Sequence, residues 1–168
     1  MAAVGLVHWR KMVEPDLVSV GRVGDAVHLD YPEDAAIIAE RLKLYPAGCL
    51  VLDDGRSIRG YTVAHPWFFG RPPPLNSLLG GLPVRADTFY IHDLALVPEV
   101  RGGDLGAKAV DLLARRAELD GMTSMSLVAV GSSPRFWRRN GFEVIEREET
   151  RAASSSYGKA AFMARFLL

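Results

Sequence analysis

The spacing of apolar residues in the first third of the chain predicts one strand, two helices and a β-hairpin. Apolar positions recur at near-helical intervals in two segments, and the first of these follows Glu14-Pro-Asp16, where a proline suits the first helical turn. The turn Asp53-Asp-Gly-Arg56 separates two apolar runs, as in a hairpin. The predicted elements are strands at 4–13, 49–53 and 57–65 and helices at 16–29 and 31–44.

The rest of the chain predicts strands that alternate with helices. The predicted elements are strands at 87–97, 123–130, 142–147 and 157–168 and helices at 104–120 and 133–140. The resulting order, β-α-α-β-β-β-α-β-α-β-β, is typical of an α/β sandwich around one central sheet. A length of 168 residues suits one such domain, which we expect to span 1–168.

A Pro- and Gly-rich segment, 69–83, interrupts this pattern. It is too irregular for a helix or strand and too apolar for a bare linker. Its apolar residues and their neighbours must cover either the body of the domain or a ligand, and packing against the domain is the simpler interpretation. These residues are Trp67, Phe68, Phe69, Leu75, Leu78 and Leu79.

Composition excludes several classes of function. The 20 Lys and Arg residues balance 20 Asp and Glu residues, so a general basic field for nucleic acid is absent from the sequence. The single cysteine, Cys49, excludes an intrachain disulfide and a Cys-rich zinc site, and we expect no metal. The sequence has no apolar run of membrane-spanning length and no leader segment, so we expect a cytoplasmic protein without membrane contact.

The segment from Leu94 to Ala107 predicts an anion site. An apolar strand ends there, a Gly-rich turn follows, and a helix begins near Asp104. The first N–H groups of a helix lack partners within the helix, and the helix dipole adds positive charge at that end. The turn matches neither the Walker loop nor the dinucleotide fingerprint. A phosphorylated ligand is the functional interpretation, and a Gly-rich turn without a ligand is the alternative.

The strand before this turn carries a candidate proton acceptor. Strict alternation places Tyr90 and His92 on one face of the strand with Leu94 and Leu96, and Asp93 on the other face with Ile91, Ala95 and Val97. A histidine can take the proton that an ammonium nucleophile must lose. A structural histidine is the alternative.

The segment from Ser132 to Phe142 predicts a short helix with two aromatic residues. Phe136 and Trp137 either dock the helix on the sheet or form a wall for the thioester arm of a cofactor. Arg135, Arg138 and Arg139 either meet phosphate or form a solvated face.

Three motifs occur in order between residues 88 and 142. They are Leu94-Ala-Leu-Val-Pro98, Arg101-Gly-Gly-Asp-Leu-Gly106 and Phe136-Trp-Arg-Arg-Asn-Gly-Phe142. They resemble the cofactor strand, the pyrophosphate loop and the aromatic signature of the GNAT superfamily of acyl-CoA-dependent N-acyltransferases. The resemblance implies a mixed, mostly antiparallel central sheet of about seven strands, flanked by about four helices.

The same resemblance implies acetyl-CoA as the acyl donor and an N-acetyltransferase acting on a primary amine by direct attack. The amide near Leu96 would polarise the thioester carbonyl, and Tyr90 and His92 occupy positions where several members carry the proton acceptor. The implied cofactor-binding residues are Leu94, Ala95, Leu96, Arg101, Gly102, Gly103, Asp104, Leu105, Gly106, Ala107, Phe136 and Trp137.

Two departures from the family pattern bear on these expectations. Asp104 stands where the family usually has glycine, which places a carboxylate near the pyrophosphate. Trp137 stands where many members have a tyrosine that acts as general acid, and Tyr157 is a candidate substitute. A non-catalytic module that senses acyl-CoA or docks to a partner is therefore the alternative function.

The acceptor is expected to be a small-molecule or peptide amine. We expect it to enter near Tyr31 and Tyr45, between the two N-terminal helices and the segment around Trp67–Leu79. The apolar C-terminal strand is a candidate for pairing across a homodimer.

Overall fold

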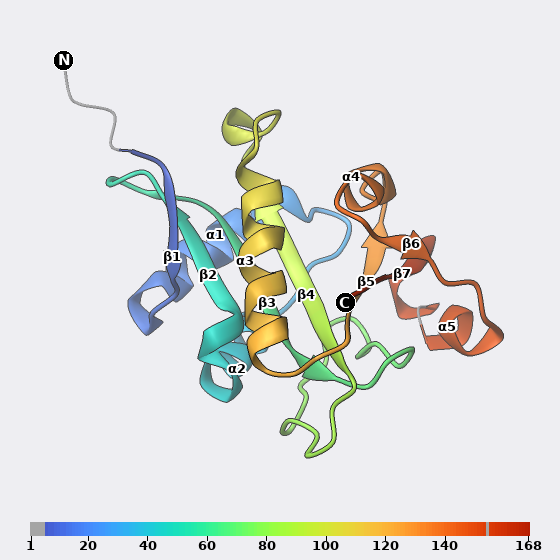
Figure 1. Ribbon diagram of the computed structural model, residues 1–168. Coiled ribbons are helices and arrows are strands. Elements are labelled where there is room, and N and C mark those ends of the chain that lie inside the picture. Colours follow the sequence, from blue (N-terminus) through green and yellow to red (C-terminus); the bar gives the residue numbers. More distant parts are fainter. Residues whose placement is uncertain (1–5, 154) are drawn as a thin grey trace.

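A computed structural model describes residues 6–153 and 155–168. Over these residues the chain forms one seven-stranded sheet in the order β1-β2-β3-β4-β5-β7-β6 (Figure 1). The predicted α/β class and the mostly antiparallel sheet are confirmed. The strands are β1 (His8–Lys11), β2 (Cys49–Asp53), β3 (Ile58–Trp67), β4 (Thr88–Leu96), β5 (Ser124–Val130), β6 (Glu143–Val144) and β7 (Ala160–Phe166). Residues 4 and 5 of the first predicted strand lie outside the described part.

Helices cover both faces of the sheet, with α3 across one face and α1 and α2 behind the other (Figure 1). Two separate apolar cores follow from this arrangement: Val110 and Leu113 of α3 belong to one, and Val20 and Val23 of α1 to the other. Full burial of each such side chain contributes about 1.5–3 kcal/mol. The helices are α1 (Leu17–Val27), α2 (Ala35–Leu44), α3 (Leu105–Leu119), α4 (Pro134–Arg139) and α5 (Glu148–Ala153), of which α5 was not predicted.

The sheet splits between β4 and β5. These parallel strands pair only at Phe89 with Met125 and at Tyr90 with Ser126, whereas β5 pairs with β7 along its whole length. Beyond Tyr90 the two strands diverge, so the sheet opens into a V on the side where α3 and α4 begin (Figure 1). The facing edges of both strands are therefore open to a ligand.

A β-bulge in β4 overturns the strict alternation expected for this strand. Val63 pairs with Asp93 and Ala64 pairs with Ile91, which leaves His92 as the extra residue. His92 and Asp93 consequently both point to the face covered by α1 and α2. The prediction that they lie on opposite faces was wrong, because one inserted residue reverses every later position.

The irregular segment between β3 and β4 packs against the domain, as the simpler interpretation predicted. The Phe69 ring lies edge-on against Phe162 and is tilted against Phe166. Buried Arg41 donates to the Ser77 carbonyl at 2.9 Å, and Glu40 accepts from the backbone N–H groups of Leu79 and Gly80. Helix α2 thereby fixes this segment over one end of the sheet.

The C-terminal strand, β7, lies between β5 and β6 in the sheet. The short strand β6 pairs with it only at Met163 and Ala164. Pairing of β7 across a homodimer stays a prediction. Among the described helices, none has both the length and the apolar character needed to cross a membrane.

Candidate active site

Three adjacent cavities lie around the opening of the V. The cofactor groove, about 660 Å³, runs from the end of β4 past the Gly-rich turn to α4. The vertex cavity, about 110 Å³, lies where β4 and β5 diverge. The helix cavity, about 580 Å³, lies between α1 and α2. His28 and Tyr31 line all three cavities, so the groove and the helix cavity meet at the vertex.

The Gly-rich turn at the mouth of the groove is open. Gly102 adopts φ +85, a conformation that glycine accepts without strain. A Cβ built on Gly102 or Gly103 would meet no described atom within 4 Å. The turn is therefore not filled by side chains of the described chain, and a ligand can approach its backbone closely.

Asp104 leaves the start of α3 accessible. Its side chain makes no capping hydrogen bond within the described structure, and instead pairs with Lys108 at 3.3 Å on the exposed surface. The amides from Leu105 to Ala107 thus keep the positive end of the helix available to an anion.

The edge of β4 presents two of the three predicted strand residues to the groove. The Val97 N–H group donates to the Arg59 carbonyl of β3. In an antiparallel pair, every second residue directs its backbone N–H and C=O groups to the same neighbouring strand. Ala95 therefore bonds toward β3, whereas Leu94 and Leu96 turn their N–H and C=O groups to the groove. The Leu96 carbonyl already accepts from Arg101 Nε at 2.9 Å.

Helix α4 forms the opposite wall. Phe136 packs so closely on α3 that a Cβ on Gly106 would approach its ring to 3.0 Å. Trp137 is 7% exposed and stacks edge-on between Phe136 and Phe142. Both aromatic residues line the groove and also dock α4 on the domain. Docking of the helix is confirmed, and the wall for the thioester arm of a cofactor stays a prediction.

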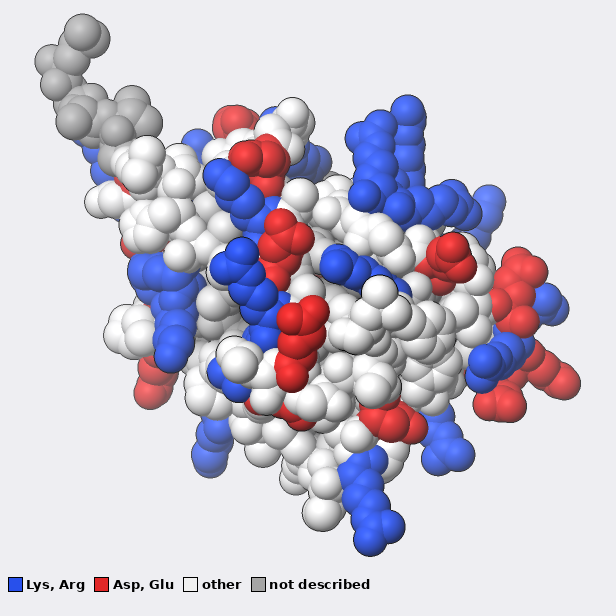
Figure 2. All heavy atoms as spheres, viewed as in Figure 1, with Lys and Arg blue, Asp and Glu red and all other residues white. Residues whose placement is uncertain are grey.

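Basic side chains rim the groove. Arg101 and Arg139 line it, and Figure 2 shows Lys and Arg side chains gathered over the region of α4. Positive charge at this rim favours a ligand that carries several phosphates.

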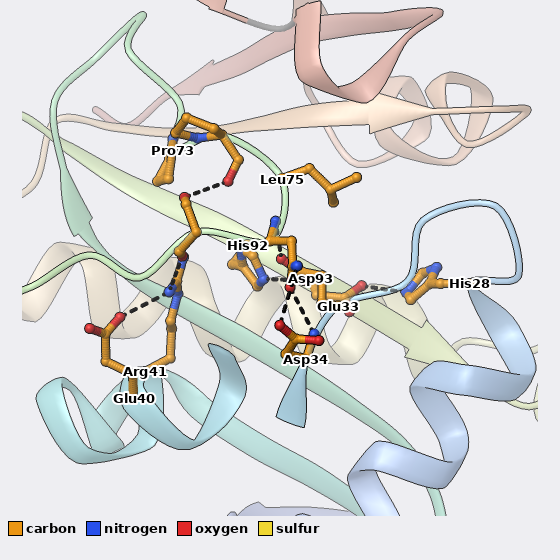
Figure 3. A network of polar contacts seen from close by, with 12 residues as sticks. His28, Glu33, Asp34, Glu40, Arg41, Pro73, Leu75, His92 and Asp93 are labelled. Carbon is orange, nitrogen blue, oxygen red and sulfur yellow. Dashed lines mark hydrogen bonds and ion pairs between the residues drawn. The ribbon is translucent and has the colours of Figure 1, made fainter. Parts of the chain in front are cut away.

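A hydrogen-bonded pair, Glu33–His92, lies at the vertex (Figure 3). His92 Nε2 donates to Glu33 Oε1 at 2.7 Å, and the Asn76 backbone N–H donates to Glu33 Oε2 at 3.0 Å. Burial alone would raise the pKa of Glu33. The hydrogen bond from His92 and the electrostatic attraction of its ring hold the Glu33 pKa below its ordinary value. The His92 side chain is 2% exposed and that of Glu33 14%, so Glu33 is the end of the pair that a ligand meets.

A second pair, His28–Asp93, faces the same space. His28 Nε2 lies 2.7 Å from Asp93 Oδ1, and the Tyr61 hydroxyl donates to the other oxygen of this carboxylate. Burial would lower the pKa of His28, but the Asp93 carboxylate raises it above the ordinary value. Burial would raise the pKa of Asp93, but its bond to His28 lowers it. Each group therefore favours the charged form of the other.

The two predicted tyrosines have different surroundings. Tyr157 lines the vertex cavity and donates from its hydroxyl to the Pro73 carbonyl at 3.1 Å. Burial raises the pKa of Tyr157 to about 12. Tyr90 is 1% exposed and lines none of the three cavities in the described structure. The structure thus brings Tyr157 and the Glu33–His92 pair to the vertex cavity, whereas Tyr90 contacts the Tyr157 side chain from outside the cavity lining.

Comparison with protein families decides the classification. The model of the acetyltransferase (GNAT) family matches residues 11–142. The chain belongs to the GNAT family. The sequence has no match among curated proteins.

Solved structures share the GNAT fold. Ard1 from Thermoplasma volcanium is 18% identical with a TM-score of 0.72, covering 96% of this chain and 98% of its own. A GNAT-like decarboxylase, GphF, in complex with isobutyryl-CoA is 17% identical with a TM-score of 0.76, covering 96% and 100%. N-acetylglutamate synthase from Neisseria gonorrhoeae, complexed with coenzyme A and L-arginine, is 16% identical with a TM-score of 0.67, covering 97% and 34%. At these low sequence identities, the similarity establishes only that this chain shares their fold.

Sequence reasoning missed three polar residues at the vertex of this GNAT domain. Glu33 and His28 come from the connection between α1 and α2, and Asp93 reaches the same face as His92 through the bulge. A local signal for the bulge was absent from the sequence. Of the two tyrosines expected near the acceptor, Tyr31 lines the cavities, whereas Tyr45 packs on Phe89 away from them.

Proposed function

We propose that this GNAT protein transfers an acetyl group from acetyl-CoA to a primary amine. The observation that carries the proposal is the junction of two cavities. The cofactor groove and the helix cavity meet at the vertex, where the Glu33–His92 pair lies. A donor and an acceptor that enter from opposite sides would meet beside a carboxylate that can hold an ammonium group.

The residues of the cofactor groove fit coenzyme A. The open backbone at Gly102 and Gly103 suits the pyrophosphate, and the turned-out backbone of Leu94 suits the pantetheine arm as an added strand. Arg101 and Arg139 suit the remaining phosphate charge. Bound acetyl-CoA would supply the thioester whose acetyl group is transferred. The Leu96 N–H faces the groove and is placed to polarise the thioester carbonyl.

The Glu33–His92 pair is assigned to the amine. Glu33 binds the incoming ammonium, which loses its first proton to water, because a carboxylate with a lowered pKa cannot take that proton from an amine. As the nitrogen forms the new C–N bond and the C–S bond breaks, Glu33 accepts the second, now acidic proton, and His92 orients the carboxylate through Nε2. This assignment moves the contact with the amine from His92 to its partner, because Glu33 is the more exposed of the two.

Tyr157 is assigned a hydrogen bond to the departing sulfur, for which its hydroxyl turns away from the Pro73 carbonyl, rather than a proton transfer. Its pKa of about 12 lies well above that of a thiol, roughly 8.5, so protonation of the thiolate by Tyr157 is uphill. A hydrogen bond from the hydroxyl stabilises the negative sulfur without this cost. Water then supplies the proton.

Trp137 favours the second candidate function, an acyl-CoA-binding module without turnover. The indole cannot act as the general acid that a tyrosine supplies at this position in many members. Such a module would bind CoA tightly and release no thiol with any amine.

The test follows free thiol release with acetyl-CoA and a panel of primary amines. We expect Glu33→Gln to lower kcat about 100-fold or more, since loss of general base catalysis costs about that factor. We expect His92→Gln to shift the pH–rate profile, because it changes the partner that orients Glu33. Asp111→Asn, on the exposed face of α3, is the matched control and should change neither quantity.

Normal turnover by Glu33→Gln would remove the pair from the mechanism. Tight CoA binding without turnover of any amine by the unaltered protein would replace acyl transfer with the second candidate function.

A further inference from the structure

The helix cavity is wide because the facing sides of α1 and α2 carry small residues. Gly21 of α1 and Ala35, Ala36 and Ala39 of α2 line it. A Cβ built on Gly21 would meet no described atom within 4 Å. The cavity volume of about 580 Å³ falls in the range of small-molecule sites, about 300–1,000 Å³.

The lining of this cavity is predominantly acidic. Four carboxylates line it, and none of the described lining residues is Lys or Arg. His28 faces one of them, Asp93, at 2.7 Å, and His92 donates to Glu33 from outside the lining. Among the described residues, Asp25 and Asp34 therefore have no cationic partner. The charged lining groups are Asp25, Glu33, Asp34, Asp93 and His28.

The remaining lining is apolar. Leu17, Val18 and Val20 come from α1, and Ile38 comes from α2. Val18 is 67% exposed, so the cavity offers hydrocarbon surface that the described protein leaves in water. Burial of a hydrocarbon chain on this surface is favourable.

We propose that the acceptor is a primary amine with an apolar body and no carboxylate, seated between α1 and α2. This inference rests on the proposed acyl transfer and names the substrate class of the same site. The ammonium group lies at the inner end beside Glu33 and Asp93, and the hydrocarbon body lies against Leu17, Val18 and Ile38. An amino acid with a free carboxylate meets like charge throughout this cavity and is disfavoured.

The first experiment compares acceptors that differ in one property. 2-Phenylethylamine and L-phenylalanine share a ring and an amine and differ by one carboxylate. We expect kcat/KM to be at least 100-fold higher for 2-phenylethylamine. Hexylamine and methylamine differ in apolar length, and we expect at least a tenfold preference for hexylamine.

The second experiment narrows the cavity. Gly21→Leu places a side chain into the space between the helices, and leucine also favours the helix over glycine, so folding is retained. We expect the ratio of kcat/KM for hexylamine to that for methylamine to fall at least tenfold. Ala26→Leu, on the same helix but outside the lining of the cavity, is the matched control and should leave this ratio unchanged.

Calorimetric titration of hexylamine into the protein saturated with CoA separates the claim of an amine site between α1 and α2 from the claim of acyl transfer. Turnover of L-phenylalanine or a peptide amine in preference to 2-phenylethylamine would overturn the substrate class and leave acyl transfer standing. Binding of hexylamine that Gly21→Leu weakens, without turnover of any amine, would support the site and overturn acyl transfer. If Gly21→Leu leaves the ratio of kcat/KM for hexylamine to that for methylamine unchanged, the proposed binding of the amine between α1 and α2 is overturned.

Discussion

Asp93→Asn tests whether the His28–Asp93 pair is charged in the folded protein. The substitution keeps the size of the side chain and one acceptor oxygen, and removes the negative charge that His28 faces at 2.7 Å. The two side chains are 24% and 12% exposed, so solvent screens their interaction only in part. A hydrogen bond to a charged group contributes about 1.5–3 kcal/mol, against about 1 kcal/mol for a neutral one.

The dependence on pH follows from the raised pKa of His28. The stabilisation is fully present below the unfolded pKa of about 6.5 and is lost as pH rises through the higher folded value. The pKa of Asp93 is lowered, so this carboxylate stays ionised throughout that window. We therefore expect Asp93→Asn to lower the free energy of unfolding by about 0.5–2 kcal/mol at pH 6, the difference between a charged and a neutral hydrogen bond, and by less at pH 9, where His28 has lost its charge.

Urea denaturation at both pH values measures these differences. Asp25→Asn, an exposed carboxylate on α1, is the matched control and should change the free energy of unfolding by less than about 0.5 kcal/mol at either pH. Equal destabilisation by Asp93→Asn at pH 6 and pH 9 would refute a charged pair.

Two further predictions concern the cofactor side of the site. Asp104→Asn should change the Kd for CoA by less than about threefold by calorimetry, since the carboxylate is 73% exposed and pairs with Lys108; tenfold tighter binding would show that it faces the phosphates. Tyr157→Phe should lower kcat about tenfold with an unchanged pH–rate profile, which is the effect of about 1.4 kcal/mol from one hydrogen bond; loss of an alkaline limb would instead identify Tyr157 as a proton donor.

Local pattern predicted most of the fold. The hairpin of β2 and β3 and the start of α3 depend on turn residues and apolar periodicity that lie within one segment of sequence. The Gly-rich turn was found for the same reason, because the chemistry of a helix start is local.

The elements that were missed depend on contacts between distant segments. The bulge at His92 arises from the register of β4 against β3, which single-strand alternation cannot show. Helix α5 is too short to form without tertiary support. It packs against β7, and its buried Thr150 lies beside Gly70 of the segment before β4. Glu33 reaches His92 from 59 residues away, so their pairing had no signal in either segment.

Coenzyme A binding to a blocked turn tests the central claim most directly. Gly103→Val places a side chain over the amides of the turn, in space where the described structure has no atom within 4 Å of the new Cβ. Gly81→Val, an equally open position in the segment before β4, is the matched control. By calorimetry we predict that CoA binds the unaltered protein and Gly81→Val with a Kd below about 100 μM, and Gly103→Val at least about tenfold more weakly, a loss of about 1.4 kcal/mol. Equal affinity of all three proteins, or no binding by any of them, would contradict a diphosphate held by this turn.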